Sequence, residues 1–190
     1  MSDSFEDVLA FWFGPADRRG KPRPEWFRKD AAFDEEIRGR FGELHRAAAV
    51  RGLEAWRASP EPMLALVVLL DQFSRNLFRG DARAFAQDAH ARECAREALA
   101  RADDLRMLPV ERQFLYLPFV HSEEARDQDR GVDRMASLEV FEETRGVAEW
   151  AEKHRAIIRR FGRFPHRNAA LGRPSTPAEL EFLARPGSGF

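Results

Sequence analysis

The amino-acid sequence predicts an all-α fold, and three observations support this prediction. Apolar residues recur at the helical spacing i, i+3, i+4, i+7 along most of the chain. Alternation of apolar and polar residues with a period of two, bounded by turn residues, is not sustained. Capping residues, helix-initiating prolines and terminal glycines separate the periodic segments. We therefore predict about eight helices in antiparallel pairs, joined by short loops, in a single domain over residues 1–190.

The first two predicted helices begin at capping residues. Ser4 caps a helix with the apolar stripe Phe5–Trp12, which Gly14 ends. Asp30 opens a second helix with acidic residues in its first turns, where the helix dipole favours them. We expect this second helix to end near Gly52.

The third predicted helix contains the longest apolar run of the chain. Ser59 and Pro60 are a cap followed by proline at the first helical position, and they precede the run Met63–Leu70. The helix continues to Asn76 and ends at Gly80. A helix that is apolar on all sides belongs at the centre of a domain. Eight apolar residues fall well short of the roughly 20 that cross a bilayer, so we predict no membrane span.

Two helices are predicted between residues 81 and 121. Asp81 starts one that carries apolar and small residues to Leu99. Pro109 starts the next, in which Pro118 removes a backbone hydrogen bond and should kink or end the helix near His121.

Three more helices are predicted in the rest of the chain. Ser122 caps one that runs to about Glu143, and the stripe Val147–Phe161 marks another, which Gly162 ends. Thr176-Pro177-Ala178-Glu179 is a capping box that opens a short final helix.

Composition excludes several classes of function. The net charge is −1 and charges of both signs are dispersed, which argues against nucleic-acid binding. Cys94 is the only cysteine and the N-terminus has no signal-peptide pattern, so we predict a cytoplasmic protein. Phosphate-binding loop, serine-hydrolase and zinc-protease motifs are missing, and we expect neither cofactor nor metal. The bias of 28 Arg to 3 Lys is uniform and is typical of genome composition.

Three polar segments stand out against this background. In the first, Asp71–Gly80, helical spacing places Arg75 and Arg79 on one face with Asp71, and Asn76 close beside it. Because this face follows a buried run, its polar groups need partners. They form either a structural network between helices or the wall of a cleft.

The second segment contains His121, Ser122, Glu123, Asp127 and Gln128 at a predicted helix break. A His and a Glu three residues apart are one pattern for metal ligation, but a di-iron bundle needs paired motifs in the opposite order. Capping by Ser122, with acidic residues in the first turn, explains most of the pattern without a metal.

The third segment, Phe161–Asn168, follows a helix and is irregular. Arg163, His166, Arg167 and Asn168 could form an anion-binding concavity with a titratable group. The alternative is a loop that its arginines pin to helix ends. His154 lies on the apolar stripe of the preceding helix, as a satisfied core residue or as part of the same site.

The chain resembles the bacterial domain-of-unknown-function family 924, which is assigned to the tetratricopeptide-like helical superfamily. The resemblance extends nearly end to end, and it departs from the family pattern at Ser74, where proline is typical. It implies tetratricopeptide-like helix pairs, although no sequence repeat is clear, and it implies no catalytic residues. The matching stretches are Phe11–Gly14, Asp71–Gly80, Glu111–Arg112, Phe114–Pro118, His121–Glu123, His154–Arg155 and Arg160–Arg173 continuing into Ser175-Thr176.

Our leading hypothesis is a binding module with a polar cleft for an anionic small molecule or an acidic peptide terminus. It rests on three polar segments that lie at helix ends far apart in sequence, a placement that suits convergence. In one variant the chain's own end, Gly187–Phe190, docks in a groove of this chain or a neighbour. The predicted binding residues are Arg75, Asn76, Arg79, His154, Arg163, His166, Arg167 and Asn168.

Two alternatives remain open. One is an enzyme, a hydrolase or transferase of phosphorylated or carboxylated metabolites, with His121 or His166 as general acid or base. Glu123 or Asp127 would then orient the histidine, and arginines would stabilise developing charge. The other is a structural homo-oligomer in which these motifs only pack.

Overall fold

The structure is a computed structural model that describes residues 4–15 and 17–187. Over these residues it is all-α: α-helices and short 3-10 turns occur, and no strand. The helices are α1 (Phe5–Phe13), α2 (Ala31–Ala49), α3 (Pro60–Val67), α4 (Ser74–Leu77), α5 (Asp88–Ala100), α6 (Pro109–Val120), α7 (Ala125–Ala136), α8 (Val147–Phe161) and α9 (Pro177–Leu183). The 3-10 turns are η1 (Pro24–Trp26), η2 (Glu54–Ala58), η4 (Ala82–Phe85), η5 (Asp103–Arg106), η6 (Glu142–Thr144) and η7 (Pro165–Arg167).

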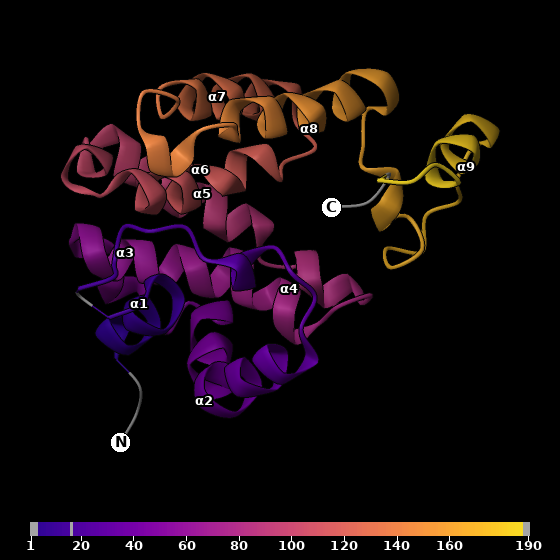
Figure 1. The fold of residues 1–190 in the computed structure, drawn as a ribbon. Coiled ribbons are helices and arrows are strands. Elements are labelled where there is room, and N and C mark those ends of the chain that lie inside the picture. The colour runs from indigo at the N-terminus through magenta and orange to yellow at the C-terminus, as the bar shows by residue number, and fades with distance from the viewer. Residues whose placement is uncertain (1–3, 16, 188–190) are drawn as a thin grey trace.

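The predicted fold class and helix number are confirmed. A π-helical segment, η3 (Val68–Phe73), joins α3 to α4 without a break, so the described part of the chain holds eight continuous helices. Helices that are neighbours in sequence pack in pairs, as α6 does with α7 and α7 with α8. Figure 1 shows α1 to α4 in one half of the molecule and α5 to α8 in the other.

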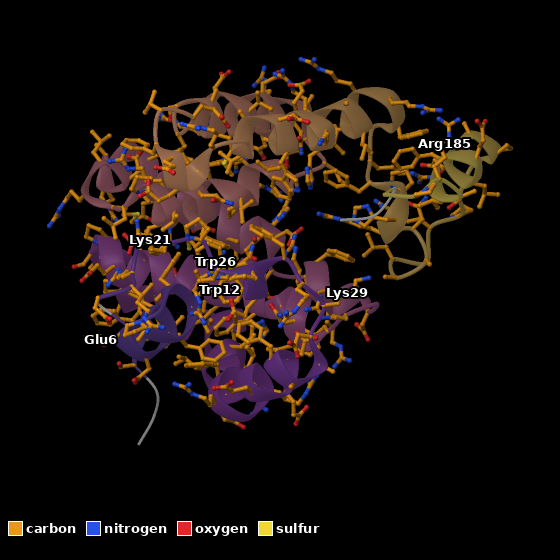
Figure 2. The ribbon with its side chains drawn as sticks, in the orientation of Figure 1. Glu6, Trp12, Lys21, Trp26, Lys29 and Arg185 are labelled. Carbon is orange, nitrogen blue, oxygen red and sulfur yellow. The ribbon has the colours of Figure 1, made fainter. Side chains whose placement is uncertain are left out.

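The continuous helix from α3 through η3 lies at the centre, as its composition predicts. Every residue of Met63–Leu70 is fully buried. Aromatic rings from α1, η1 and α6 pack around it: the Trp12 ring centre lies 5.6 Å from that of Phe73 in η3, and the Phe114 ring centre lies 5.5 Å from that of Trp12 and 4.7 Å from that of Trp26. Figure 2 shows Trp12 and Trp26 next to each other in the interior. Burial of such rings is the main favourable term in folding.

Capping side chains position three of the helix starts that the sequence predicts, whereas the Ser59 side chain makes no capping hydrogen bond to α3. The Ser4 side chain accepts a hydrogen bond from Asp7 N, and the Asp30 side chain accepts from the backbone of the first turn of α2. The Thr176 capping box is formed. Gly162 ends α8 in the left-handed conformation with φ +71°. Three of the predicted boundaries are therefore explained by side chains that satisfy exposed backbone N–H groups.

The region after the central helix differs from the prediction. The helix expected to start at Asp81 is divided: the Asp81 carboxylate caps η4, and α5 begins only at Asp88. α6 ends at Val120, two residues after Pro118, in agreement with the predicted break.

The predicted helix from Ser122 to Glu143 is shorter than expected. It starts at Ala125 because the Ser122 hydroxyl donates to Asp127 and accepts from Glu124 N, instead of capping the first turn. It ends at Ala136 because Glu139 leaves the helix and caps the next one, accepting from Gly146 N at 3.0 Å and from Ala148 N at 2.8 Å. The sequence holds no local signal for that long-range cap.

The C-terminal segment, residues 162–187, extends away from α8 and carries α9 (Figure 1). A second, small apolar cluster of Ile157, Ile158 and Phe164 forms its base, with Phe161 and Phe182 packed against it. Among the helices that the structure describes, none is long and apolar enough to cross a bilayer.

Candidate functional site

The candidate site begins at the π-helical segment η3, which holds a fully buried carboxylate, Asp71. π-helical turns inside α-helices are frequent at functional sites because they re-aim side chains. The Ser74 hydroxyl stabilises the end of this segment by donating to Leu70 O at 2.6 Å, and it also contacts His45 Nε2 at 2.8 Å. A proline at position 74 would supply neither bond.

Asp71 pairs with His121, which caps the C-terminus of α6. His121 Nδ1 lies 2.9 Å from both Asp71 carboxylate oxygens, and Gln72 Nε2 donates to Asp71 Oδ2 at 2.6 Å. A carboxylate only accepts hydrogen bonds, so Nδ1 carries the proton and Nε2 has the lone pair. Nε2 has no hydrogen-bond partner among the described residues, and the His121 side chain remains 12% exposed.

A second carboxylate, Asp88, joins two arginines from segments far apart in sequence. Arg75 donates to Asp88 Oδ1 at 3.1 Å and to Oδ2 at 3.3 Å, and Arg167 donates to Oδ2 at 3.1 Å. Arg75 also donates to Asp71 O at 2.7 Å, and Arg167 donates to His121 O at 2.9 Å. These contacts connect all three polar segments. We call Asp71, Arg75, Asp88, His121 and Arg167 the polar centre.

Burial and neighbouring charge set the protonation states in the polar centre. Burial opposes ionisation of Asp71, but Arg75 and His121 outweigh it and hold the pKa of Asp71 well below its usual range. Burial lowers the pKa of His121 against the opposite pull of Asp71, so the ring is neutral at pH 7. A neutral imidazole that a carboxylate orients is suited to accept a proton at Nε2.

Arg167 differs from an ordinary surface arginine in its burial and in its pKa. It is 6% exposed, and burial together with the nearby charge of Arg75 lowers its pKa to about 10. Its guanidinium carbon lies 4.6 Å from the ring centres of both Phe85 and Phe164. Its Nε–H is buried and lacks a hydrogen-bond partner within the described residues. A buried N–H donor without an acceptor is unfavourable, so an acceptor atom on a ligand would form a favourable hydrogen bond there.

Histidine and aromatic rings lie beside the polar centre. The His154 ring centre lies 4.0 Å from that of Trp150 and 6.2 Å from that of His121. His154 Nδ1 donates to Trp150 O at 2.9 Å. Burial lowers the pKa of His154 to about 3, and burial with the charge of Arg167 lowers that of His166 to about 4. Both rings are therefore neutral at pH 7.

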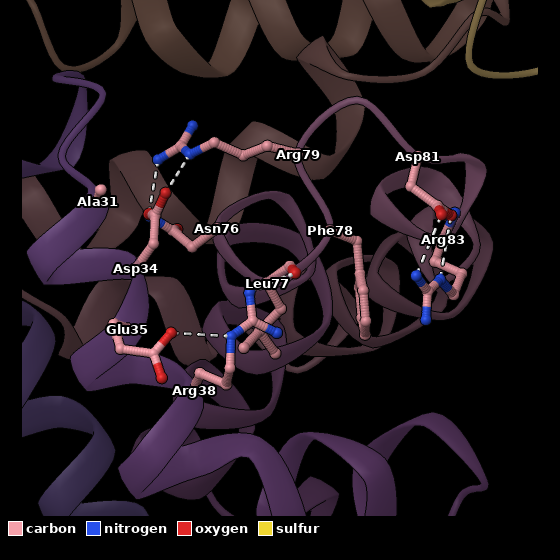
Figure 3. A pocket seen from close by; sticks show the side chains of 10 residues that line it. All are labelled: Ala31, Asp34, Glu35, Arg38, Asn76, Leu77, Phe78, Arg79, Asp81 and Arg83. Atoms are coloured by element: carbon pink, nitrogen blue, oxygen red, sulfur yellow. Dashed lines mark hydrogen bonds and ion pairs between the residues drawn. The ribbon is translucent and has the colours of Figure 1, made fainter.

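Two of the residues predicted for the same cleft lie elsewhere. Figure 3 shows Asn76 and Arg79 directed at Asp34 of α2, to which they donate at 2.7 and 2.8 Å. Arg79 does not share a helical face with Asp71 and Arg75, because α4 ends at Leu77. These two side chains tie α2 to the central helix.

Other predicted residues hold the C-terminal segment together. Arg163 donates to Glu179 and to Pro174 O, and Asn168 donates to Ser175 Oγ at 3.0 Å.

Glu123, a predicted orienting residue, is engaged by the same segment. It accepts two hydrogen bonds from Arg173 and one from Phe164 N.

Sequence reasoning missed Asp88, Phe85 and Trp150. Asp88 follows Phe85 by three residues and so shares the apolar face of the predicted helix, which is the available signal for a buried charge. The spacing of Trp150 indicates only an apolar stripe. In the described ranges, no group of three His, Cys, Asp or Glu side chains is arranged to hold a metal ion. The tail predicted to dock, Gly187–Phe190, has its last three residues outside the described ranges.

Comparisons place the chain among proteins without an assigned activity. Residues 8–187 match the family described as bacterial protein of unknown function (DUF924). The structure of a protein of unknown function, ATU0120 from Agrobacterium tumefaciens, superimposes with a TM-score of 0.82 at 42% sequence identity. That similarity covers 95% of this chain and 96% of the other. No curated protein matches the chain.

Proposed function

We propose, from the premise that the chain belongs to the DUF924 family of bacterial proteins of unknown function, that its polar centre binds a small anionic molecule or an acidic peptide terminus. The observation that carries this proposal is Arg167, a buried cation with a lowered pKa and an unused Nε–H. A carboxylate or phosphate at this position would accept that hydrogen bond. Its negative charge would also raise the pKa of the guanidinium again, because an opposite charge favours the ionised form.

The arrangement of the arginines supports an anion rather than a neutral ligand. Arg75 and Arg167 share one carboxylate, Asp88, and the positive charge of each disfavours the charge of the other. A guanidinium presents a planar fork that matches carboxylate and phosphate oxygens. The rings of Phe85 and Phe164 hold the Arg167 fork in place before a ligand arrives, which reduces the entropy lost on binding.

Thermal stability in the presence of simple anions tests this proposal. We expect phosphate, acetate or succinate to raise the Tm of the wild-type chain by about 3–6 °C at tenfold excess over the dissociation constant. Arg167→Gln should abolish the increase. Arg79→Gln is the matched control, because Arg79 pairs with Asp34 outside the polar centre, and it should keep the increase. An equal increase in Arg167→Gln would place the anion elsewhere.

A second candidate function, enzymatic proton transfer, is favoured by the Asp71–His121 pair. Asp71 fixes the tautomer of His121 and leaves Nε2 as a base, the arrangement that general base catalysis uses. Glu123 is engaged with Arg173 and Phe164 N, so we assign the orienting role to Asp71 instead. His166 remains the other candidate acid or base.

A hydrolysis screen with phosphate and carboxylate esters tests the enzymatic candidate. We expect His121→Asn to remove turnover, and Asp71→Asn to lower kcat by a large factor through the wrong tautomer. If no ester is turned over and no anion raises the Tm, the polar centre only ties helices together. That result would favour the third alternative, a structural homo-oligomer in which these motifs only pack.

We also propose that the helix pairs are tetratricopeptide-like. The support is the packing of α6 with α7 and of α7 with α8, in sequence order, together with the family resemblance. In such arrays each pair is stabilised mainly by its neighbours. Native-state hydrogen exchange should then show stepwise protection across α5 to α8, and one uniform exchange rate would contradict this assignment.

A further inference from the structure

A pocket of about 470 Å³ lies between α2 and the turn that follows α4, away from the polar centre. It adjoins a second pocket of about 510 Å³, drawn in Figure 3, and the two share Arg38, Leu77, Phe78 and Arg83. The second pocket offers little to a ligand, because Asn76, Arg79 and Asp34 saturate one another there. The first pocket has a different inner wall, formed by Gly39, Gly42 and His45.

His45 supplies an unused hydrogen-bond acceptor in this pocket. The Ser74 hydroxyl gives its only proton to Leu70 O, so it must accept from His45, which fixes the proton on His45 Nε2. Nδ1 therefore has the lone pair. It has no partner among the residues that the structure describes, and it is not sealed from solvent. Because His45 is only 5% exposed and lines the pocket, its opening to solvent is through the pocket.

Phe78 and the backbone of α2 form two of the walls of the pocket. The Phe78 ring centre lies 5.5 Å from that of His45, and the Arg83 guanidinium carbon lies 4.6 Å from the Phe78 ring centre. A Cβ atom built on Gly39 or Gly42 would meet no atom within 4 Å, so the backbone of α2 is open to close approach. A flat ring fits between such walls.

Three arginines also line the pocket. They are Arg38, Arg46 and Arg83, with Glu43 as the acidic side chain among its described lining residues. Arg46 and Arg83 form exposed ion pairs with Glu43 and Asp81, and such pairs contribute little and can be exchanged for a ligand anion.

We propose that this pocket binds a planar aromatic molecule that carries a ring N–H or O–H donor and an anionic substituent. The ring donor bonds to His45 Nδ1, the ring packs on Phe78 against the α2 glycines, and the anion faces the three arginines. The low pKa of His45, about 4 because of burial, keeps the ring neutral and the lone pair available at pH 7. This site is independent of the anion site proposed at Arg167.

Calorimetric titration with three probes tests the assignment. Indole-3-acetate and 4-hydroxybenzoate carry both the donor and the anion, whereas 1-methylindole-3-acetate lacks the ring N–H. We expect the first two to bind and methylation to weaken binding about tenfold, the effect of leaving a buried acceptor unpaired. His45→Leu should remove the difference between the indole and its methylated form.

A blocking variant and a control variant complete the test. Gly42→Leu places a side chain in the open space of the pocket and should abolish binding while the fold is retained, as circular dichroism checks. Arg167→Gln should keep the difference between indole-3-acetate and its methylated form, which separates this site from the polar centre. The proposal is overturned if neither donor-bearing probe binds at 10 mM (about 2.7 kcal/mol of binding), if methylation has no effect, or if Gly42→Leu binds normally.

Discussion

Asp88 is the residue on which the polar centre depends electrostatically. It is the carboxylate that Arg75 and Arg167 share, and all three side chains are largely withdrawn from water. Removing one member of a buried charge cluster is costly when it leaves an ion without an ion-pair partner, and less costly when every remaining ion keeps one.

We predict unequal losses of stability for two variants of this cluster. Asp88→Asn leaves Arg75 paired with Asp71 but removes the ion-pair partner of the buried Arg167, and it should lower the free energy of unfolding by about 3–5 kcal/mol. Arg167→Met leaves Asp88 paired with Arg75 and keeps the apolar stem, so it should cost less than about 2 kcal/mol. Urea unfolding at pH 7 measures both. Equal losses would mean that Arg167 is a structural residue, contrary to a role in ligand binding.

Buried neutral histidines give the molecule a defined pH dependence. Burial holds the pKa of His45 at about 4 and that of His154 at about 3, both below the ordinary value near 6.5. Between pH 6.5 and 4 the unfolded chain binds protons that the folded chain does not. The free energy of unfolding should therefore be greatest above pH 6.5 and fall as the pH decreases through this window.

The slope of this pH dependence is measurable. Two fully linked histidines give roughly 2–3 kcal/mol per pH unit, and His121 and His166, whose pKa values burial also lowers, add to this slope. Urea unfolding at pH 7.5, 6.5, 5.5 and 4.5 measures it. His154→Gln removes one titrating group and should flatten the curve by about 1.4 kcal/mol per unit. A curve that is flat from pH 7.5 to 4.5 would show that these rings are protonated in the folded protein.

At the scale of the elements, α7 approaches the end of α6 closely at Gly131. A Cβ atom there would lie 2.9 Å from Val120 Cγ2 and 3.1 Å from Val120 N. The backbone nitrogen belongs to the last turn of α6 and cannot move without disturbing His121, the next residue. Glycine is required here because a side chain would not fit, and not because of the backbone conformation, since the φ of Gly131 is not positive.

We predict that Gly131→Ala destabilises the protein by about 1–3 kcal/mol through overpacking. Gly39→Ala is the matched control, because Gly39 is also inside a helix and no atom lies within 4 Å of the position that the added methyl group would take. It should stabilise the protein by about 0.5–1 kcal/mol through helix propensity. Thermal unfolding of the two variants measures the contrast, and similar shifts in both would contradict the close approach.

Three helix starts that the sequence predicts correctly, those of α1, α2 and α9, have local capping chemistry. The side chains of Ser4, Asp30 and Thr176 bond backbone groups within three residues, so a short window of sequence contains the whole interaction. The end of α7 depends instead on Glu139, which caps α8 from seven residues before Gly146. The π-helical winding of η3 likewise has no sequence signature.

At the scale of the whole molecule, the convergence of the polar segments could be predicted only in part. Arg75, His121 and Arg167 meet because helix ends gather polar groups that need partners. Arg79 departs because α4 ends at Leu77, and a carboxylate on α2, Asp34, lies within reach. Periodicity defines the faces of a helix, but it does not identify the distant residue that meets each face.

Glu123 couples the C-terminal segment to the rest of the fold. Its carboxylate accepts from Arg173 at 2.7 and 3.0 Å and from Phe164 N at 2.8 Å, and the segment between these two residues carries Arg167 into the polar centre. The apolar cluster at the base of this segment is small, so few apolar contacts hold the segment in place. Local opening is expected where buried apolar contact is sparse.

We predict that Glu123→Gln frees residues 164–187 without unfolding the helices before them. A glutamine keeps an acceptor for Phe164 N but loses the charge-assisted pair with Arg173, a contribution of about 1.5–3 kcal/mol. Hydrogen exchange of α9 and tryptic cleavage at Arg167 and Arg173 should accelerate about tenfold or more, while protection of α3 stays unchanged. Glu124→Gln is the control, since the side chain of the neighbouring Glu124 is 64% exposed and its ion pair with Arg92 is long, with 3.4 Å between Oε1 and Nη2. If Glu123→Gln instead lowers protection in every helix together, the segment and the remainder unfold as one cooperative unit, and Arg167 cannot be released from the polar centre on its own.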